Sequence, residues 1–362
     1  MAAAHWLTGR AAPDARLGPS LPKDPKSIAI SIDSKRHRRY TEGEQKTNMG
    51  QKSPAARVRI GPAGWSYPDW EGIVYPREKP RGFHPATYLA QFFDTIEINS
   101  TFYNPPAVET VRGWVRRIEH NKGFLFTAKL WQRFTHERAA TLEDEKTFKR
   151  ALEPLASAGR LGALLVQFPW SLKNTRDERE YVAGLCVRFR EFPLVLEVRH
   201  SSWNQPETFQ LLSELGVGFC NVDQPVIGRA LGPTEAAIPE SRVGYVRLHG
   251  RNYQHWFALD ENVAERYNYL YSVEELKPWV ERIRKVAART DATFVVTNNH
   301  FQGKAVANAV QLTNLLTHCR ARAPESLVRH FPELETIAEV SVSTKGPQQA
   351  DLAFEPAGTK RG

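Results

Sequence analysis

Short apolar runs and amphipathic segments alternate along most of this chain. Eight runs of β-branched and other apolar residues have the length of strands, and they span residues 58–63, 95–99, 124–130, 162–168, 194–199, 218–223, 244–249 and 293–299. Seven segments carry apolar residues at helical spacing, at 85–93, 108–120, 142–158, 177–191, 206–215, 273–289 and 305–322. This alternation predicts a single-domain α/β fold of the (β/α)8 TIM-barrel type. An open, doubly wound parallel sheet is the alternative.

Two connections depart from the alternation. Residues 224–242 lack a clear helical pattern, and residues 251–271 form a long insertion rich in Tyr and Asn after the seventh strand. Long loops that follow the strands of a barrel commonly carry its function. We therefore expect functional residues near them.

The two ends of the chain have a different composition. Residues 1–56 lack sustained hydrophobic periodicity and are expected to form a disordered basic extension, with Met49 as an alternative natural start. The barrel is expected over residues 57–322. Residues 323–362 are expected to form a C-terminal extension that ends in a polar tail.

Polar residues on the predicted strands fall mostly on one face. Side chains alternate faces along a strand, and in a barrel the apolar face packs against the helices, so the polar face is expected to point into the lumen. The polar set consists of Thr95, Glu97, Asn99, Thr127, Lys129, Gln167, Glu197, Arg199, Asn221, Asp223, Tyr245, Arg247, His249, Thr297 and Asn299. Residues at the carboxyl ends of barrel strands are the usual catalytic and binding positions.

These groups predict acid/base chemistry on an anion. The candidate acids and bases are Glu97, Glu197, Asp223 and His249, of which the imidazole is the group most easily poised near neutral pH. The groups expected to bind the anion are Lys129, Arg199, Arg247 and Arg251. The groups expected to orient the substrate are Asn99, Gln167 and Asn299, with Trp65, Tyr67 and Tyr103 as aromatic contacts.

Lys129 has a second candidate role. A lysine at the end of a barrel strand can form a Schiff base with a carbonyl substrate. Because several acidic residues are expected nearby, they should keep the amine protonated. The electrostatic role is therefore the preferred interpretation.

No cofactor is predicted. The chain has neither a Gly-Lys-Ser/Thr phosphate loop nor a G-x-G-x-x-G fingerprint. A divalent metal is left as an alternative, because Glu197, Asp223 and His249 stand on three successive strands and supply suitable ligand types. The neighbouring arginines argue against a cation at that place.

Charge and cysteine content limit the partners. The net charge is +9, but residues 1–48 hold nine Lys or Arg against five Asp or Glu, so much of the excess lies in the extension. Nucleic acid is therefore disfavoured as a partner and stays an alternative. No apolar run is long enough to cross a membrane, and three widely spaced cysteines suggest a reducing cytoplasm. The sequence indicates no oligomeric state.

Several motifs in chain order resemble the YecE-like family, domain of unknown function 72. They are GWSYPDW (64–70), EINSTFY (97–103), FTAK (126–129), QFP (167–169), EVRHSSW (197–203), YVRLHGR (245–251) and the Asn pair at 298–299. The resemblance covers about residues 57–320. It implies a TIM-type barrel and no established reaction. Ala63 departs from the small hydroxyl residue expected there.

The expected function is an enzyme, of hydrolase or isomerase/lyase type, that acts by acid/base chemistry on a small phosphorylated or carboxylated substrate. The alternatives are a nucleic-acid binding or processing factor and a non-catalytic metabolite sensor. A glycosidase is disfavoured, because Gln167, Arg247 and His249 occupy strand ends where many barrel glycosidases carry glutamates.

Overall fold

The computed structural model describes residues 57–256 and 263–341. The predicted basic extension at 1–56, including Met49, lies outside the described residues, as does the predicted tail from residue 342 onward.

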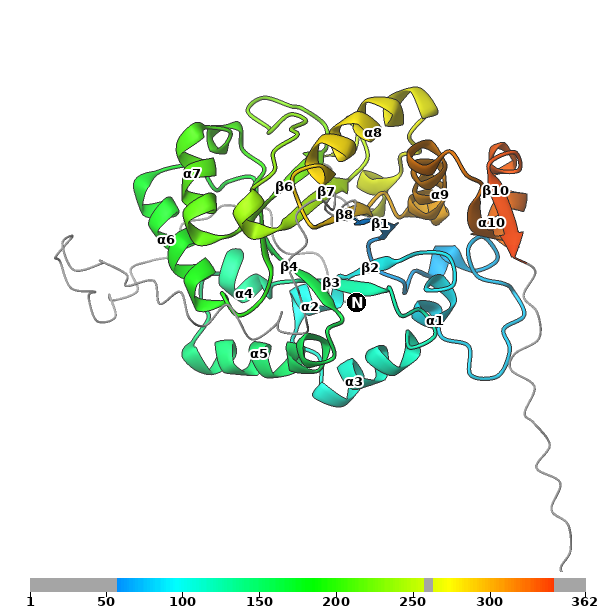
Figure 1. The fold of residues 1–362 in the computed structure, drawn as a ribbon, viewed down its shortest axis with the longest axis horizontal. Coiled ribbons are helices and arrows are strands. Elements are labelled where there is room, and N and C mark those ends of the chain that lie inside the picture. Colours follow the sequence, from blue (N-terminus) through cyan, green and yellow to red (C-terminus); the bar gives the residue numbers. More distant parts are fainter. Residues whose placement is uncertain (1–56, 257–262, 342–362) are drawn as a thin grey trace, which may run out of the picture. The chain divides into compact units, whose positions relative to one another are not determined.

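Eight parallel strands form one sheet, in the spatial order β1-β8-β7-β6-β5-β4-β3-β2 (Figure 1). They are β1 (Arg57–Pro62), β2 (Thr95–Ile98), β3 (Leu125–Lys129), β4 (Leu161–Gln167), β5 (Leu194–Glu197), β6 (Gly218–Asp223), β7 (Val243–Leu248) and β8 (Ala292–Thr297). A parallel bridge between Ala63 and Glu97 joins the two outer strands. The sheet therefore closes on itself, which confirms the predicted barrel and excludes the open sheet.

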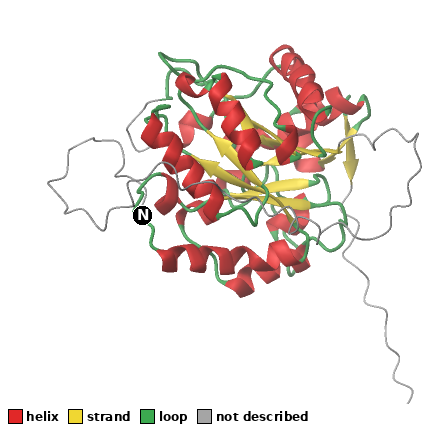
Figure 2. Ribbon diagram, turned by 60° about the vertical axis from the view of Figure 1, so that its left-hand side comes forward, coloured by secondary structure: helices red, strands yellow, loops and turns green. Residues whose placement is uncertain are grey.

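Helices surround the strands (Figure 2). They are α1 (Pro85–Leu89), α2 (Ser100–Tyr103), α3 (Val108–Arg117), α4 (Gln132–Thr135), α5 (Leu142–Ser157), α6 (Arg176–Arg188), α7 (Pro206–Leu215), α8 (Val273–Ala287), α9 (Lys304–Thr317) and α10 (Glu325–His330). Their apolar stripes bury large side chains such as Trp114 and Trp279. The described helices include none with the length and apolar character needed to span a membrane.

The connections differ in ways that position the site. Between β6 and β7 the described chain forms only a 3-10 turn, Pro239–Ser241, as the missing helical pattern predicts. The expected helix 305–322 ends early, at Thr317, because His318 adopts a left-handed conformation with φ of 58°. Two short parallel strands follow, β9 (Ala321–Pro324) and β10 (Ala338–Ser341).

Candidate active site

A buried arginine bridges two carboxylates across the barrel lumen. Arg247 on β7 donates from Nη2 to Glu97 Oε1 on β2 and from Nη1 to Glu197 Oε2 on β5, each at 2.7 Å. The Arg247 side chain is 1% exposed, and both glutamates are fully buried. Because these three strands are not neighbours in the sheet, the side chains can meet only inside the barrel. Arg247 holds the two carboxylates and is enclosed by them.

The remaining oxygens of the two glutamates also have partners. Tyr245 donates its hydroxyl to Glu97 Oε2 at 2.9 Å and lies 2.7 Å from Thr127 Oγ1. The Cys220 thiol lies 3.8 Å from Glu197 Oε2. Burial raises the pKa of both the Tyr245 hydroxyl and the Cys220 thiol. Both oxygens of Glu97 and of Glu197 thus accept hydrogen bonds. Buried carboxylates are tolerated when their oxygens are paired in this way.

Arg199 lies above this cluster, nearer to solvent. Its Nε and Nη2 donate to Glu197 Oε1 at 3.0 and 2.7 Å, and its side chain is 15% exposed. The remaining nitrogen, Nη1, has only a 3.4 Å contact with Gln224 Oε1. Burial by itself would raise the pKa of Glu197, but Arg247 and Arg199 outweigh it and hold that pKa well below its usual range.

His249 is enclosed beside Arg199. Its Nε2 lies 3.2 Å from Arg199 Nη2, and its Nδ1 lies 2.9 Å from the side-chain amide of Asn298. Burial, followed by the charges of Arg199 and Arg247, lowers the pKa of His249 to about 3. The imidazole is therefore neutral at pH 7. The expectation that it is the group poised near neutrality is wrong, because a sequence gives no measure of how deeply a ring is buried.

Lys129, at the end of β3, is the lumen group that titrates near neutral pH. Its Nζ lies 4.1 Å from the ring centroid of Phe102, and among the described residues no carboxylate lies within ion-pair distance of it. Burial, and next the charge of Arg247, lower the pKa of Lys129 to about 7. Glu97 and Glu197 act in the opposite direction but are already paired with arginines. The expectation that acidic neighbours keep Lys129 protonated is therefore wrong.

Aromatic side chains lie near Lys129 at the carboxyl ends of the barrel strands, the end of the barrel that we call the opening. Tyr103 on α2 is 61% exposed, and the His136 ring lies 4.9 Å from that of Phe102. Tyr67, which follows β1, stacks on His300, which follows β8, with ring centroids 4.3 Å apart.

Two amide side chains complete the opening. Asn99 Nδ2 lies 3.4 Å from the Tyr67 hydroxyl. Gln167, at the end of β4, pairs in register with Glu197, and its buried Oε1 has no hydrogen-bond partner. An unpartnered buried acceptor at this position is a site where a substrate hydroxyl can donate.

On β6, Asn221 and Asp223 point away from the lumen, contrary to the parity expectation. Asp223 accepts hydrogen bonds from Arg251 and from the Trp279 indole of α8, at 2.6–3.1 Å. Asn221 bonds the backbone of Ala236 in the following loop. The lumen side of this strand carries Cys220 instead. Polar outward residues are stable here because the surrounding helix and loop supply hydrogen-bond partners, which alternation alone cannot reveal.

The same reversal occurs on β8. Asn299 donates to Tyr269 O at 2.8 Å and to Asn308 Oδ1 of α9 at 2.7 Å, and Thr297 donates to Ala305 O at 2.8 Å. The neighbouring Asn298, which contacts His249, is the amide on the site side.

Two further predicted binding residues lie away from the opening. Trp65 packs on Trp114 of α3 and on Phe126, with ring centroids 5.5 and 6.0 Å apart. Arg251 pairs with Asp223 and Glu275 on the outer side of the barrel. Both positions have structural roles in the described chain.

The alternative metal set is not brought together. Asp223 faces Arg251 and Trp279, whereas Glu197 and His249 lie within the lumen, with His249 Nε2 3.4 Å from Glu197 Oε1. Across residues 57–256 and 263–341 no three acidic, His or Cys side chains gather as metal ligands do.

Four residues of this region were not among the predicted site residues: Cys220, Gln224, Asn298 and His300. Cys220 lies on the face of β6 that the polarity pattern assigned to the helices, and Gln224 follows the last residue of that strand. Asn298 and His300 flank Asn299, which was the predicted site residue.

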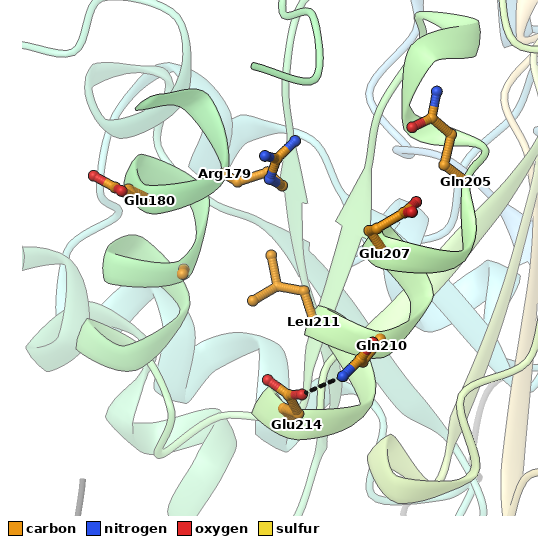
Figure 3. Close-up of a pocket in the computed structure, with 8 residues that line it drawn as sticks. Arg179, Glu180, Gln205, Glu207, Gln210, Leu211 and Glu214 are labelled. Atoms are coloured by element: carbon orange, nitrogen blue, oxygen red, sulfur yellow. Dashed lines mark hydrogen bonds between the residues drawn. The ribbon is translucent and has the colours of Figure 1, made fainter. Parts of the chain in front are cut away.

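A hollow of about 570 Å³ lies elsewhere, on the outer surface between α6 and α7 (Figure 3). Its charged lining residues are Arg179, Glu180, Glu207 and Glu214. None of the predicted site residues lines it. Three of these four charged residues are acidic, so the hollow does not offer the positive charge that the lumen offers to an anion.

Comparison with known proteins places residues 59–330 within the model of a family described as protein of unknown function DUF72. The UPF0759 protein YunF of Bacillus subtilis (strain 168) is 28% identical over 272 residues, which is 72% of this chain and 94% of that protein. A solved DUF72 family protein from Thermotoga maritima MSB8 is 34% identical, with a TM-score of 0.61 over 72% of this chain and 98% of that one. Another, from Enterococcus faecalis V583, is 23% identical, with a TM-score of 0.64 over 72% and 95%.

Proposed function

Since the chain belongs to the DUF72 family, described only as proteins of unknown function, we propose a function from its barrel opening: an enzyme that binds a small anion there and moves protons through Lys129. The observation that carries this proposal is the surplus of positive groups. Arg247 and Arg199 are paired with Glu97 and Glu197, and Lys129 has no carboxylate partner among the described residues. A phosphate or carboxylate would supply the missing counter-charge.

Each group has a separate task in this proposal. Arg199 offers Nη1 to the anion, and Gln167 offers its unpartnered Oε1 to a substrate hydroxyl. Glu97 and Glu197 hold the arginines in place and do not touch the substrate. Lys129 gives and takes the proton, because a pKa of about 7 is suited to both directions at neutral pH. The reaction is of hydrolase or isomerase/lyase type.

Cellular location belongs to the same proposal. Cys186, Cys220 and Cys319 are free thiols. Free thiols are typical of a reducing compartment, which supports a cytoplasmic enzyme.

The experiment is calorimetric titration with sulfate, which keeps its charge between pH 6 and pH 8.5. A bound anion favours the protonated amine, so sulfate affinity should fall as pH rises through the Lys129 pKa of about 7. Arg199→Gln and Lys129→Met should each weaken sulfate binding about tenfold or more, the cost of one charge-assisted hydrogen bond.

Arg176→Gln is the matched control, because Arg176 lies on the exposed surface of α6 and pairs with Glu180. Its sulfate affinity should equal that of the wild type. If Lys129→Met binds sulfate as tightly as the wild type does, the proposal is contradicted.

A further inference from the structure

We infer that the Lys129 amine is a nucleophile, which attacks the carbonyl carbon of an anionic aldehyde or ketone and forms an imine. This inference rests on the proposed function and narrows its substrate class to oxo acids and phosphorylated carbonyl compounds. It also assigns Lys129 covalent chemistry in addition to proton transfer.

The surroundings of Lys129 fix its position but leave its amine available. Its backbone is held on both sides by Thr101, whose Oγ1 donates to Lys129 O at 2.8 Å and lies 3.1 Å from Lys129 N. The same hydroxyl lies 3.0 Å from Ile98 O of β2. The amine itself rests on the Phe102 ring. The residue as a whole is only partly buried, and a fixed stem with an amine that no carboxylate pairs is what a nucleophilic lysine requires.

Other lysines of the chain show the contrast. Lys149 lies 2.9 Å from both Glu145 and Glu191, and Lys285 lies 2.9 Å from Glu235. For Lys149 the two carboxylates outweigh burial and raise the pKa, which makes its amine less reactive. Lys129 has no such contact in the described chain.

The charged and titratable groups that face Lys129 come from four elements: Glu97 on β2, Glu197 and Arg199 on and after β5, Arg247 on β7, and His136 after α4. The two carboxylates are each engaged by an arginine, so they stabilise the ammonium form only weakly. Burial and the arginines favour the neutral amine, and they lower the pKa of Lys129 to about 7. A pKa near 7 leaves a substantial fraction of the protein with a neutral amine at neutral pH.

The anionic group of the substrate follows from the charges. Imine formation places a positive charge where the neutral amine stood, and a substrate anion at Arg199 Nη1 compensates it. With a neutral aldehyde, the iminium formed on Lys129 would add a positive charge near Arg199 and Arg247 with no anion to compensate it. The geometry therefore favours a carbonyl compound that carries its own carboxylate or phosphate.

The covalent step balances without a further reagent. The amine lone pair forms the C–N bond while the C=O π pair moves to oxygen, and a proton passes from nitrogen to that oxygen through water. The resulting carbinolamine takes up one proton and loses water as the nitrogen lone pair forms C=N. The net change is amine plus carbonyl plus proton to iminium plus water. Addition of water reverses the sequence.

The test is reductive trapping with glyoxylate and sodium cyanoborohydride at pH 7, with the modified lysines located by peptide mass spectrometry. Lys277, whose side chain is 63% exposed, is the internal reference. A surface lysine is neutral in roughly one molecule in a thousand or fewer at pH 7. Because a less basic amine is also less nucleophilic, we expect Lys129 to be carboxymethylated about tenfold or more faster than Lys277.

Variants and competition separate the outcomes. Lys129→Arg keeps the charge and should abolish the fast adduct, whereas Lys277→Arg should leave the Lys129 rate unchanged. Sulfate should slow labelling of Lys129 and leave Lys277 unaffected. Labelling of Lys129 no faster than Lys277, with sulfate still bound, overturns the imine and leaves the anion site standing. If sulfate does not bind and Lys129 is labelled no faster than Lys277, both the imine and the anion site are overturned.

Discussion

At the scale of single residues, two cations in one lumen have opposite roles. Arg247 cannot lose its proton, and its planar guanidinium contacts Glu97 and Glu197 at the same time. Lys129 is a point charge that can become neutral when it is desolvated. The arginine therefore stabilises the arrangement, and the lysine is left as the reactive group.

Replacing Arg247 tests the stabilising role. Arg247→Met leaves two buried carboxylates without their shared partner, and the free energy of unfolding should fall by ~3–5 kcal/mol. Urea denaturation at pH 7 measures this change. The double variant Arg247→Met with Glu97→Gln should recover part of the loss, because it removes the Glu97 charge that has lost its arginine, whereas Glu197 still pairs with Arg199. A loss under ~1 kcal/mol in the single variant would contradict the assignment.

At the scale of elements, closure of the barrel depends on how closely β1 approaches β2. Gly61 on β1 faces the backbone oxygen of Thr95, which would lie 1.8 Å from an added Cβ. Two residues later Ala63 forms the bridge with Glu97, and Gly64 N donates to Glu97 O at 2.8 Å. Gly61 is therefore required by close backbone approach, and Ala63, where a hydroxyl residue was expected, is a fully buried closure residue.

Two glycine substitutions should change stability in opposite directions. Gly61→Ala forces β1 and β2 apart and should lower the free energy of unfolding by ~1–3 kcal/mol or more. Gly113→Ala, within α3 and with open space around the added Cβ, should raise it by ~0.5–1 kcal/mol. Thermal and urea denaturation of both variants measure the difference. Equal stability of the two would show that the close approach at Gly61 is unimportant.

At the scale of the whole molecule, several buried or half-buried groups make stability depend on pH in one direction. Burial lowers the pKa of His84 and His300 to about 4, and that of His249 to about 3. The unfolded chain binds protons at these histidines from about pH 6.5 downward, whereas the folded chain does not until the lower values. Their stabilising contribution is complete above about pH 6.5 and is lost as pH falls towards 4 and 3.

Glu197 acts in the same sense at lower pH. Its folded pKa is depressed, so its contribution is present above about pH 4.3, the unfolded value, and is lost as pH falls further. Lys129 extends the increase of stability with pH to the range above pH 7. The unfolded chain keeps this proton to about pH 10.4, so between pH 7 and that value deprotonation favours the folded state.

The urea midpoint should therefore decrease steadily from pH 7 to pH 4.5, more steeply than one titrating group can account for. His84→Gln should reduce that slope, because it removes one histidine that must stay neutral in the fold. His120→Gln, at an exposed position, is the control and should leave the slope unchanged. A midpoint independent of pH over this interval would contradict the assignment of buried neutral histidines.

Local patterns were sufficient for the elements and for part of the lumen. Apolar periodicity depends on neighbours within one element, so it located the eight strands and the main helices. Alternation along a strand also assigned Glu97, Glu197 and Arg247 to one side, where the structure brings them into contact.

Contacts between distant elements decided the rest. Asp223 and Asn299 face outward because Trp279 of α8 and Asn308 of α9 stand there to bond them, and those partners are 56 and nine residues away along the chain. The charge state of Lys129 depends on how deeply its side chain is buried and on the charges of arginines that are paired across the lumen. The sequence by itself determined which groups this barrel contains; tertiary structure decided which are paired and which are available, because pairing and desolvation depend on three-dimensional distance.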